Sequence, residues 1–90
     1  MPHAPNTLAW EDLTDGGRSV ETLADGHEAI AKAWTPFHLA YFVTRCPRTR
    51  LYGARMGASH AVTEATHERP EHAQAIAQHD FDARATACYR

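Results

Sequence analysis

Arginines crowd one short stretch of this 90-residue sequence, and they are the residues best suited to chemistry. Four of the nine basic residues fall between positions 45 and 55, and no acidic residue lies between positions 37 and 62. A guanidinium pairs with a carboxylate or a phosphate through parallel hydrogen bonds, and a tyrosine nearby can add a stacking surface or a hydroxyl. The candidate binding residues are Arg45, Arg48, Arg50, Tyr52 and Arg55.

Three interpretations of this basic stretch are open. The arginines can contact an acidic protein surface, enter a nucleic-acid groove, or pair with the eleven acidic residues of the chain itself. The formal net charge of −2 excludes a generally basic nucleic-acid coat protein but permits a local basic patch. Among external partners, an acidic protein or a second copy of the chain is favoured over nucleic acid.

The seven histidines raise the possibility of a metal site. His72 and His79 are seven positions apart and would share one face of a helix. His67, Glu71 and Asp80 could add ligands, but the spacing matches no compact zinc pattern. The sequence therefore predicts no metal and no cofactor.

Catalysis is the weaker alternative. Arg45 and Arg48 flank Cys46, and positive neighbours favour a thiolate. A nucleophile also needs a positioned base, and nothing in the sequence places a histidine beside this cysteine. No catalytic residue is predicted, and a small histidine-dependent enzyme or metal protein is the alternative to a binding protein.

The composition limits the location of the protein. Cys46 and Cys88 form no disulfide framework, which indicates reduced thiols in the cytoplasm. No apolar run approaches the length of a membrane span, and the N-terminus lacks the pattern of a secretory signal, so no membrane partner is expected. Frequent alanine, arginine and histidine indicate a GC-rich bacterial source.

The basic stretch reads as a β-hairpin. Residues 37–44 are rich in aromatic and β-branched side chains, and both alternating sets are largely apolar, so this strand is expected to be central and covered on both faces. Pro47 suits the turn at 46–49. A second strand is expected over 50–56, where Gly53 would weaken pairing or mark a bulge.

The residues before the hairpin predict a smaller hairpin and a helix. Weak strand patterns at 7–14 and 18–24 flank Asp15-Gly16-Gly17, a strong tight-turn signal. A helix is expected from Asp25 to Trp34, with a capping pair at its start and Pro36 just after its end. Trp34 is expected to be the buried anchor of this helix on the sheet.

The residues after the hairpin predict an edge strand and a second helix. The strand is expected over 61–66 and the helix over about 70–87, with Pro70 in its first position. Small residues recur on one helical stripe, so this helix can approach its partner closely. The stripe comprises Ala73, Ala77, Phe81, Ala85 and Cys88.

A weak sequence similarity, or echo, between residues 27–33 and 72–78 leaves internal duplication open.

The resulting order is β-β-α-β-β-β-α, an α+β fold with an antiparallel sheet and two helices packed on one face. Residues 1–6 are expected to form a flexible tail, and residues 7–90 a single domain. A chain this short has a modest core, and the small-residue stripe offers a second contact, so a homodimer is expected. The sequence thus favours a small cytoplasmic, non-enzymatic protein-interaction domain.

Overall fold

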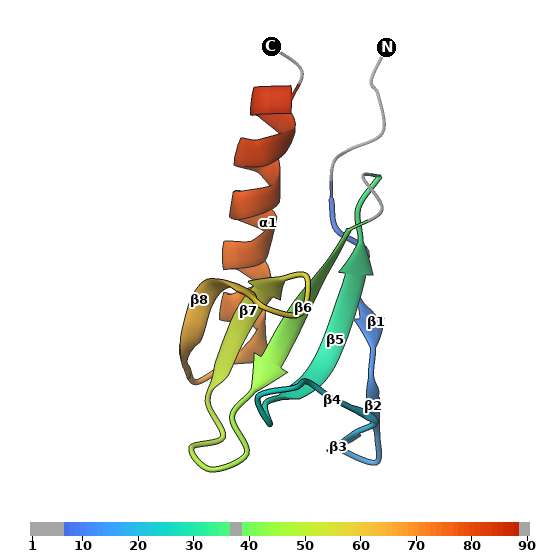
Figure 1. Cartoon of the computed structure of the whole chain (residues 1–90), viewed down its shortest axis with the longest axis vertical. Helices are drawn as coiled ribbons and strands as arrows, with labels where there is room; N and C mark the ends of the chain where they lie inside the picture. Colours follow the sequence, from blue (N-terminus) through green and yellow to red (C-terminus); the bar gives the residue numbers. More distant parts are fainter. Residues whose placement is uncertain (1–6, 37–38, 89–90) are drawn as a thin grey trace.

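An antiparallel sheet carries one long helix on one of its faces (Figure 1). The computed structural model describes residues 7–36 and 39–88, with side chains of the helix described as far as Ala85. The predicted α+β class is confirmed, whereas the predicted tail, 1–6, lies outside the described residues. The elements are β1 (Glu11–Asp12), β2 (Thr14–Asp15), β3 (Arg18–Ser19), β4 (Glu21–Thr22), β5 (Glu28–Trp34), β6 (Ala40–Arg45), β7 (Tyr52–Met56), β8 (His60–His67) and α1 (Pro70–Cys88).

The main sheet runs in the order β1-β5-β6-β7-β8, and every neighbouring pair is antiparallel. Strand β1 pairs with the later part of β5, where Glu11 lies opposite Lys32. Strand β4 pairs with the beginning of β5, where Glu21 lies opposite Ala29. Two short strands therefore close one edge of the sheet, and β8 forms the other edge, as predicted for that strand.

The central hairpin is confirmed. Strand β7 pairs over its whole length with residues 41–45 of β6, and all six residues of β6 are buried. The first predicted residues of this strand, 37 and 38, lie outside the described residues. Strand β6 is covered on both faces, which explains why its sequence lacks a polar face.

Gly53 marks the predicted bulge. The register between β7 and β8 shifts between Tyr52 and Ala54. A Cβ atom at Gly53 would lie 2.8 Å from the Thr63 carbonyl oxygen and 2.9 Å from the Ala65 amide nitrogen. The missing side chain therefore lets the backbone of β8 approach β7 closely.

The helix predicted from Asp25 to Trp34 is wrong, because most of that segment is strand β5. Asp25 does accept a backbone amide, but it accepts that of His27 at 3.1 Å, in a turn that continues through Gly26 with a φ of +92°. Strand β5 is largely buried and pairs on both sides, so it shows no alternation that would separate it from a buried helix. Long-range pairing thus outweighs the local capping signal.

Two expectations based on that helix are also wrong. Trp34 is 61% exposed at the end of β5 and does not anchor a helix on the sheet. The echo between 27–33 and 72–78 does not reflect duplicated structure, because the first segment is mainly strand and the second is helix. In the described part of the chain there is one helix instead of two.

The first predicted hairpin is present in shortened form. Strands β2 and β3 join through Gly16 and Gly17, whose positive φ values suit the tight turn. The longer predicted strands are interrupted because the backbone of this segment also forms hydrogen bonds with other strands. The Leu13 amide, for example, donates to the Ile30 carbonyl oxygen at 2.9 Å.

Helix α1 agrees with the predicted helix at 70–87 and packs the described part of its small-residue stripe, as far as Ala85, on the sheet. Ala73 and Ala77 are fully buried, and the Phe81 ring meets Tyr41 edge to face with centroids 6.2 Å apart. The Tyr41 hydroxyl donates to Asp80 at 2.6 Å. The stripe expected to support a dimer is therefore used within the chain.

A second, smaller apolar cluster covers part of the opposite face of the sheet. Leu13 and Leu23, from the segment before β5, pack there with Phe42. Strands β5 and β6 thus lie between α1 on one face and this segment on the other. Among the described residues, no helix combines the length and apolarity that a membrane span requires.

Candidate functional site

The four arginines of the hairpin do not form one surface. Arg45 lies opposite Glu28 and Tyr52 in the sheet, and this row shares the face on which α1 packs. Arg55 lies opposite Phe42, and that row shares the other face. Residues in register share a face and successive residues alternate, so the hairpin sends these two guanidinium groups in opposite directions.

Arg45, one of the candidate binding residues, is buried and forms hydrogen bonds within the fold. Its side chain is 10% exposed. The Nε group donates to Glu28 Oε1 at 2.8 Å, and Nη2 donates to the Gly17 carbonyl oxygen at 3.2 Å. The hydrogen bond to Glu28, followed by that of Tyr52, raises the pKa of Arg45 despite its burial. Tyr52 is half-buried beside it.

Arg55 is also engaged, on the opposite face. Its Nη1 donates to the Ala58 carbonyl oxygen at 3.1 Å, and its Nη2 pairs with Asp25. The guanidinium of Arg55 and then the His27 amide hold the pKa of Asp25 at about 2. Asp25 is therefore ionised at neutral pH. The pair ties the turn before β5 to β7, a link between residues thirty positions apart that no local pattern could predict.

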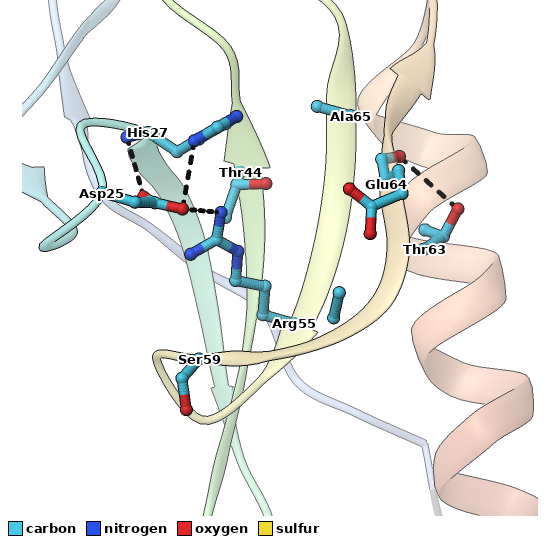
Figure 2. A pocket seen from close by; sticks show the side chains of 9 residues that line it. Asp25, His27, Thr44, Arg55, Ser59, Thr63, Glu64 and Ala65 are labelled. Atoms are coloured by element: carbon cyan, nitrogen blue, oxygen red, sulfur yellow. Dashed lines mark hydrogen bonds and ion pairs between the residues drawn. The ribbon is translucent and has the colours of Figure 1, made fainter.

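This ion pair borders a polar hollow of about 230 Å³ (Figure 2). Asp25 and His27 lie on the left of the view, Thr44 and Arg55 in the middle, and Glu64 of β8 on the right. The imidazole Nδ1 of His27 lies 3.3 Å from Asp25 Oδ2. Within the hollow, Asp25 contacts both His27 and Arg55, so these three residues form a charged link between the turn before β5 and strand β7.

Arg48 and Arg50 differ from the other two arginines. Both are exposed in the turn between β6 and β7, which projects from the lower end of the sheet in Figure 1. Among the described residues, neither makes an ion pair with an acidic side chain. Of the five candidate binding residues, Arg48 and Arg50 are exposed, Tyr52 and Arg55 are half-buried, and Arg45 is buried.

Cys46 begins this turn and is half-buried. The Thr49 hydroxyl, followed by the backbone amides of Thr49 and Arg48, lowers the pKa of its thiol. The structure also brings His27 and Asp25 to the hollow of about 280 Å³ that Cys46 lines. Within the described part of the chain, no hydrogen bond joins the thiol to His27, so the pair lacks the contact of an activated nucleophile.

The histidines near α1 contact one another and the sheet. His67 Nε2 lies 2.9 Å from the Thr63 hydroxyl, and its ring meets that of His72 edge to face with centroids 6.5 Å apart. In the described ranges, no three histidine, cysteine or acidic side chains converge as metal ligands would. His79 is exposed on α1.

Comparison with protein-family models, with curated proteins and with solved structures finds no match.

Proposed function

We propose that this α+β domain is a non-enzymatic protein-interaction module that presents Arg48 and Arg50 to an acidic surface of a partner protein. The observation that carries the proposal is the state of these two side chains. Both are exposed, and in the described residues neither has an acidic partner. The other arginines of the hairpin are engaged within the fold, so exposure is specific to the turn.

The turn is held rigidly by its own hydrogen bonds. The Cys46 amide donates to the Leu51 carbonyl oxygen at 2.9 Å, and the Arg50 amide donates back to the Cys46 carbonyl oxygen at 2.8 Å. The Leu51 amide donates to the Thr49 hydroxyl at 3.3 Å. A surface that is already ordered loses less conformational entropy when it binds, which favours recognition by this turn.

Arg50 adopts a backbone conformation that an arginine rarely adopts. Its φ is +64°, in the left-handed region that glycine occupies without steric cost. Such a conformation destabilises an L-residue by about 1 kcal/mol or more. Local strain of this kind is common where a side chain serves a function, and here the side chain is an exposed guanidinium.

The small number of exposed arginines in the turn favours a protein partner over nucleic acid. Of the four clustered arginines, only two are free to contact a phosphate backbone, whereas groove binders usually neutralise several phosphates. Two guanidinium forks on a rigid turn suit a pair of carboxylates. A small acidic patch on a protein is therefore the better match.

Self-association is part of this proposal, but exposed apolar residues now support it in place of the stripe on α1. The stripe on α1 is buried within the chain, whereas Trp34 and Leu39 are large apolar residues that remain exposed. Lys32 Nζ lies 5.1 Å from the centroid of the Trp34 ring, and the contact leaves most of that residue exposed. A homodimer would bury these exposed apolar residues. We propose that the protein is cytoplasmic and of bacterial origin.

The proposal is tested by protein capture from lysate of the source cell. Native protein should retain partners that the variant carrying Arg48→Gln and Arg50→Gln loses, and nuclease treatment should not release them. The variant Arg18→Gln is the matched control, because Arg18 is also exposed but lies on β3. Equal capture by all three proteins would refute the proposal.

A further inference from the structure

A groove of about 340 Å³ lies between residues 10–17 and α1, on the face of the sheet that the helix covers. Four separate segments line it: the β1–β2 region, β5, the β6–β7 hairpin and the first turns of α1. Its volume falls at the small end of the range for small-molecule sites. It is separate from the exposed side chains of Arg48 and Arg50, which do not line it.

Aromatic side chains give the groove its shape preference. Trp10 and Tyr52 both line it, and both are half-buried against the main core. Ile30 adds an apolar surface. Aromatic rings favour flat ligands, because stacked or edge-to-face contacts contribute beyond the area that they bury. The available volume accommodates one or two fused rings.

Arg45 supplies hydrogen-bond donors within the groove. A guanidinium carries five N–H donors; the contacts with Glu28 and Gly17 use two of them and the hydrogen bond with Tyr52 a third, which leaves two. The Arg45 side chain lines the groove and is 10% exposed. Glu28 already neutralises the charge of Arg45, so the groove offers donors without a net positive charge.

Asp12 supplies acceptors from β1. Its Oδ1 accepts from the Thr14 amide at 2.8 Å and from the Thr14 hydroxyl at 2.6 Å. These bonds use one carboxylate oxygen and leave Oδ2 available to N–H donors of a ligand. The donors of Arg45 and the acceptor of Asp12 come from different strands that line the same groove.

We infer that this groove binds an uncharged planar heterocycle that carries a carbonyl acceptor for Arg45 and N–H donors for Asp12. A purine base of the guanine type combines these features, since its carbonyl and ring nitrogen accept from an arginine. Its N–H groups can donate to a carboxylate. Adenine is equally flat but presents an amino group where guanine presents the carbonyl, so it pairs less well with a guanidinium.

The test is fluorescence titration of the full chain with guanosine. The variant Trp34→Phe leaves Trp10 as the reporter, because these are the two tryptophans of the chain. We expect saturable quenching with half-saturation below about 1 mM, a modest affinity for a ligand of this size. Adenosine should bind at least about tenfold more weakly, the effect of mismatching hydrogen bonds to a charged group.

Two further variants locate the binding. In the same background, Asp12→Ala should weaken guanosine binding at least about tenfold, whereas Asp15→Ala, an exposed neighbour outside the groove, should not. Circular dichroism confirms that each variant is folded. Absence of saturable quenching would overturn the inference, and so would equal binding of adenosine or equal effects of the two aspartate variants. Replacing Arg48 and Arg50 should leave this binding unchanged, so the inference and the proposed function can fail separately.

Discussion

Arg45 Nε lies 2.8 Å from Glu28 Oε1, and the two side chains are 10% and 25% exposed. The pair joins neighbouring strands β5 and β6 at the point where the backbone of Gly17 also reaches the guanidinium. An ion pair so far removed from water depends on both partners, because loss of one leaves an uncompensated charge.

Replacing Arg45 by glutamine should therefore destabilise the fold by about 2–3 kcal/mol. Urea unfolding followed by circular dichroism measures this change. The control is Arg48→Gln, where an exposed side chain is lost and the expected change is below about 0.5 kcal/mol. Similar free energies of unfolding for the two variants would contradict an internal role for Arg45.

Replacing Gly53 by alanine should displace β8. The new Cβ would lie 2.8 Å from a backbone oxygen of β8, and a backbone atom cannot move aside alone. We expect a loss of about 1–3 kcal/mol of stability, the range for overpacked sites. Amide exchange should accelerate mainly in residues 63–65. Unchanged stability and exchange would show that β7 and β8 are farther apart than described.

The pair between Asp25 and Arg55 predicts a specific pH dependence. The pKa of Asp25 is lowered from its ordinary value of 3.8 to about 2, first by the hydrogen bond from Arg55. Its contribution to stability is complete above pH about 4 and is lost as the pH falls toward 2. Native protein should therefore be more stable than Asp25→Asn at pH 5, and the difference should shrink at pH 2. A difference that stays constant across this interval would contradict the pairing.

The proposed homodimer predicts a mass near twice 10.0 kDa by light scattering at micromolar concentration. If the exposed Trp34 contributes to the contact, Trp34→Asp should shift the protein toward the monomer. The control Val20→Asp also changes an exposed apolar residue, but on the segment before β5, and should leave the mass unchanged. A native monomer at high concentration would remove self-association from the proposal.

Local signals predicted about half of this fold. The aromatic and β-branched run before Arg45, the turn at Pro47 and the start of α1 at Pro70 are each specified by neighbouring residues, and each is present. Strand β5 was not predictable in this way. Its capping signal at Asp25 is real, but pairing with β6 and with β1 and β4 determines the structure.

The candidate site was predictable only in part, for a similar reason. The sequence shows that arginines cluster, but the face on which each one lies depends on strand register. Arg45 and Arg55 are directed to opposite faces by that register, and their partners lie 17 and 30 positions away. Arg48 and Arg50 lie in the turn itself, so their exposure follows from the local sequence.

The most direct test of the proposed function is the variant Arg50→Gly, with stability and partner capture measured on the same protein. Glycine removes the steric cost at a φ of +64°, so the free energy of unfolding should rise by up to about 1 kcal/mol. Capture of the partners that depend on Arg48 and Arg50 should fall at least several-fold, because the guanidinium is lost. A more stable protein that captures less would show that Arg50 is strained for the sake of binding. A variant that captures its partners as well as the native protein would contradict the proposal.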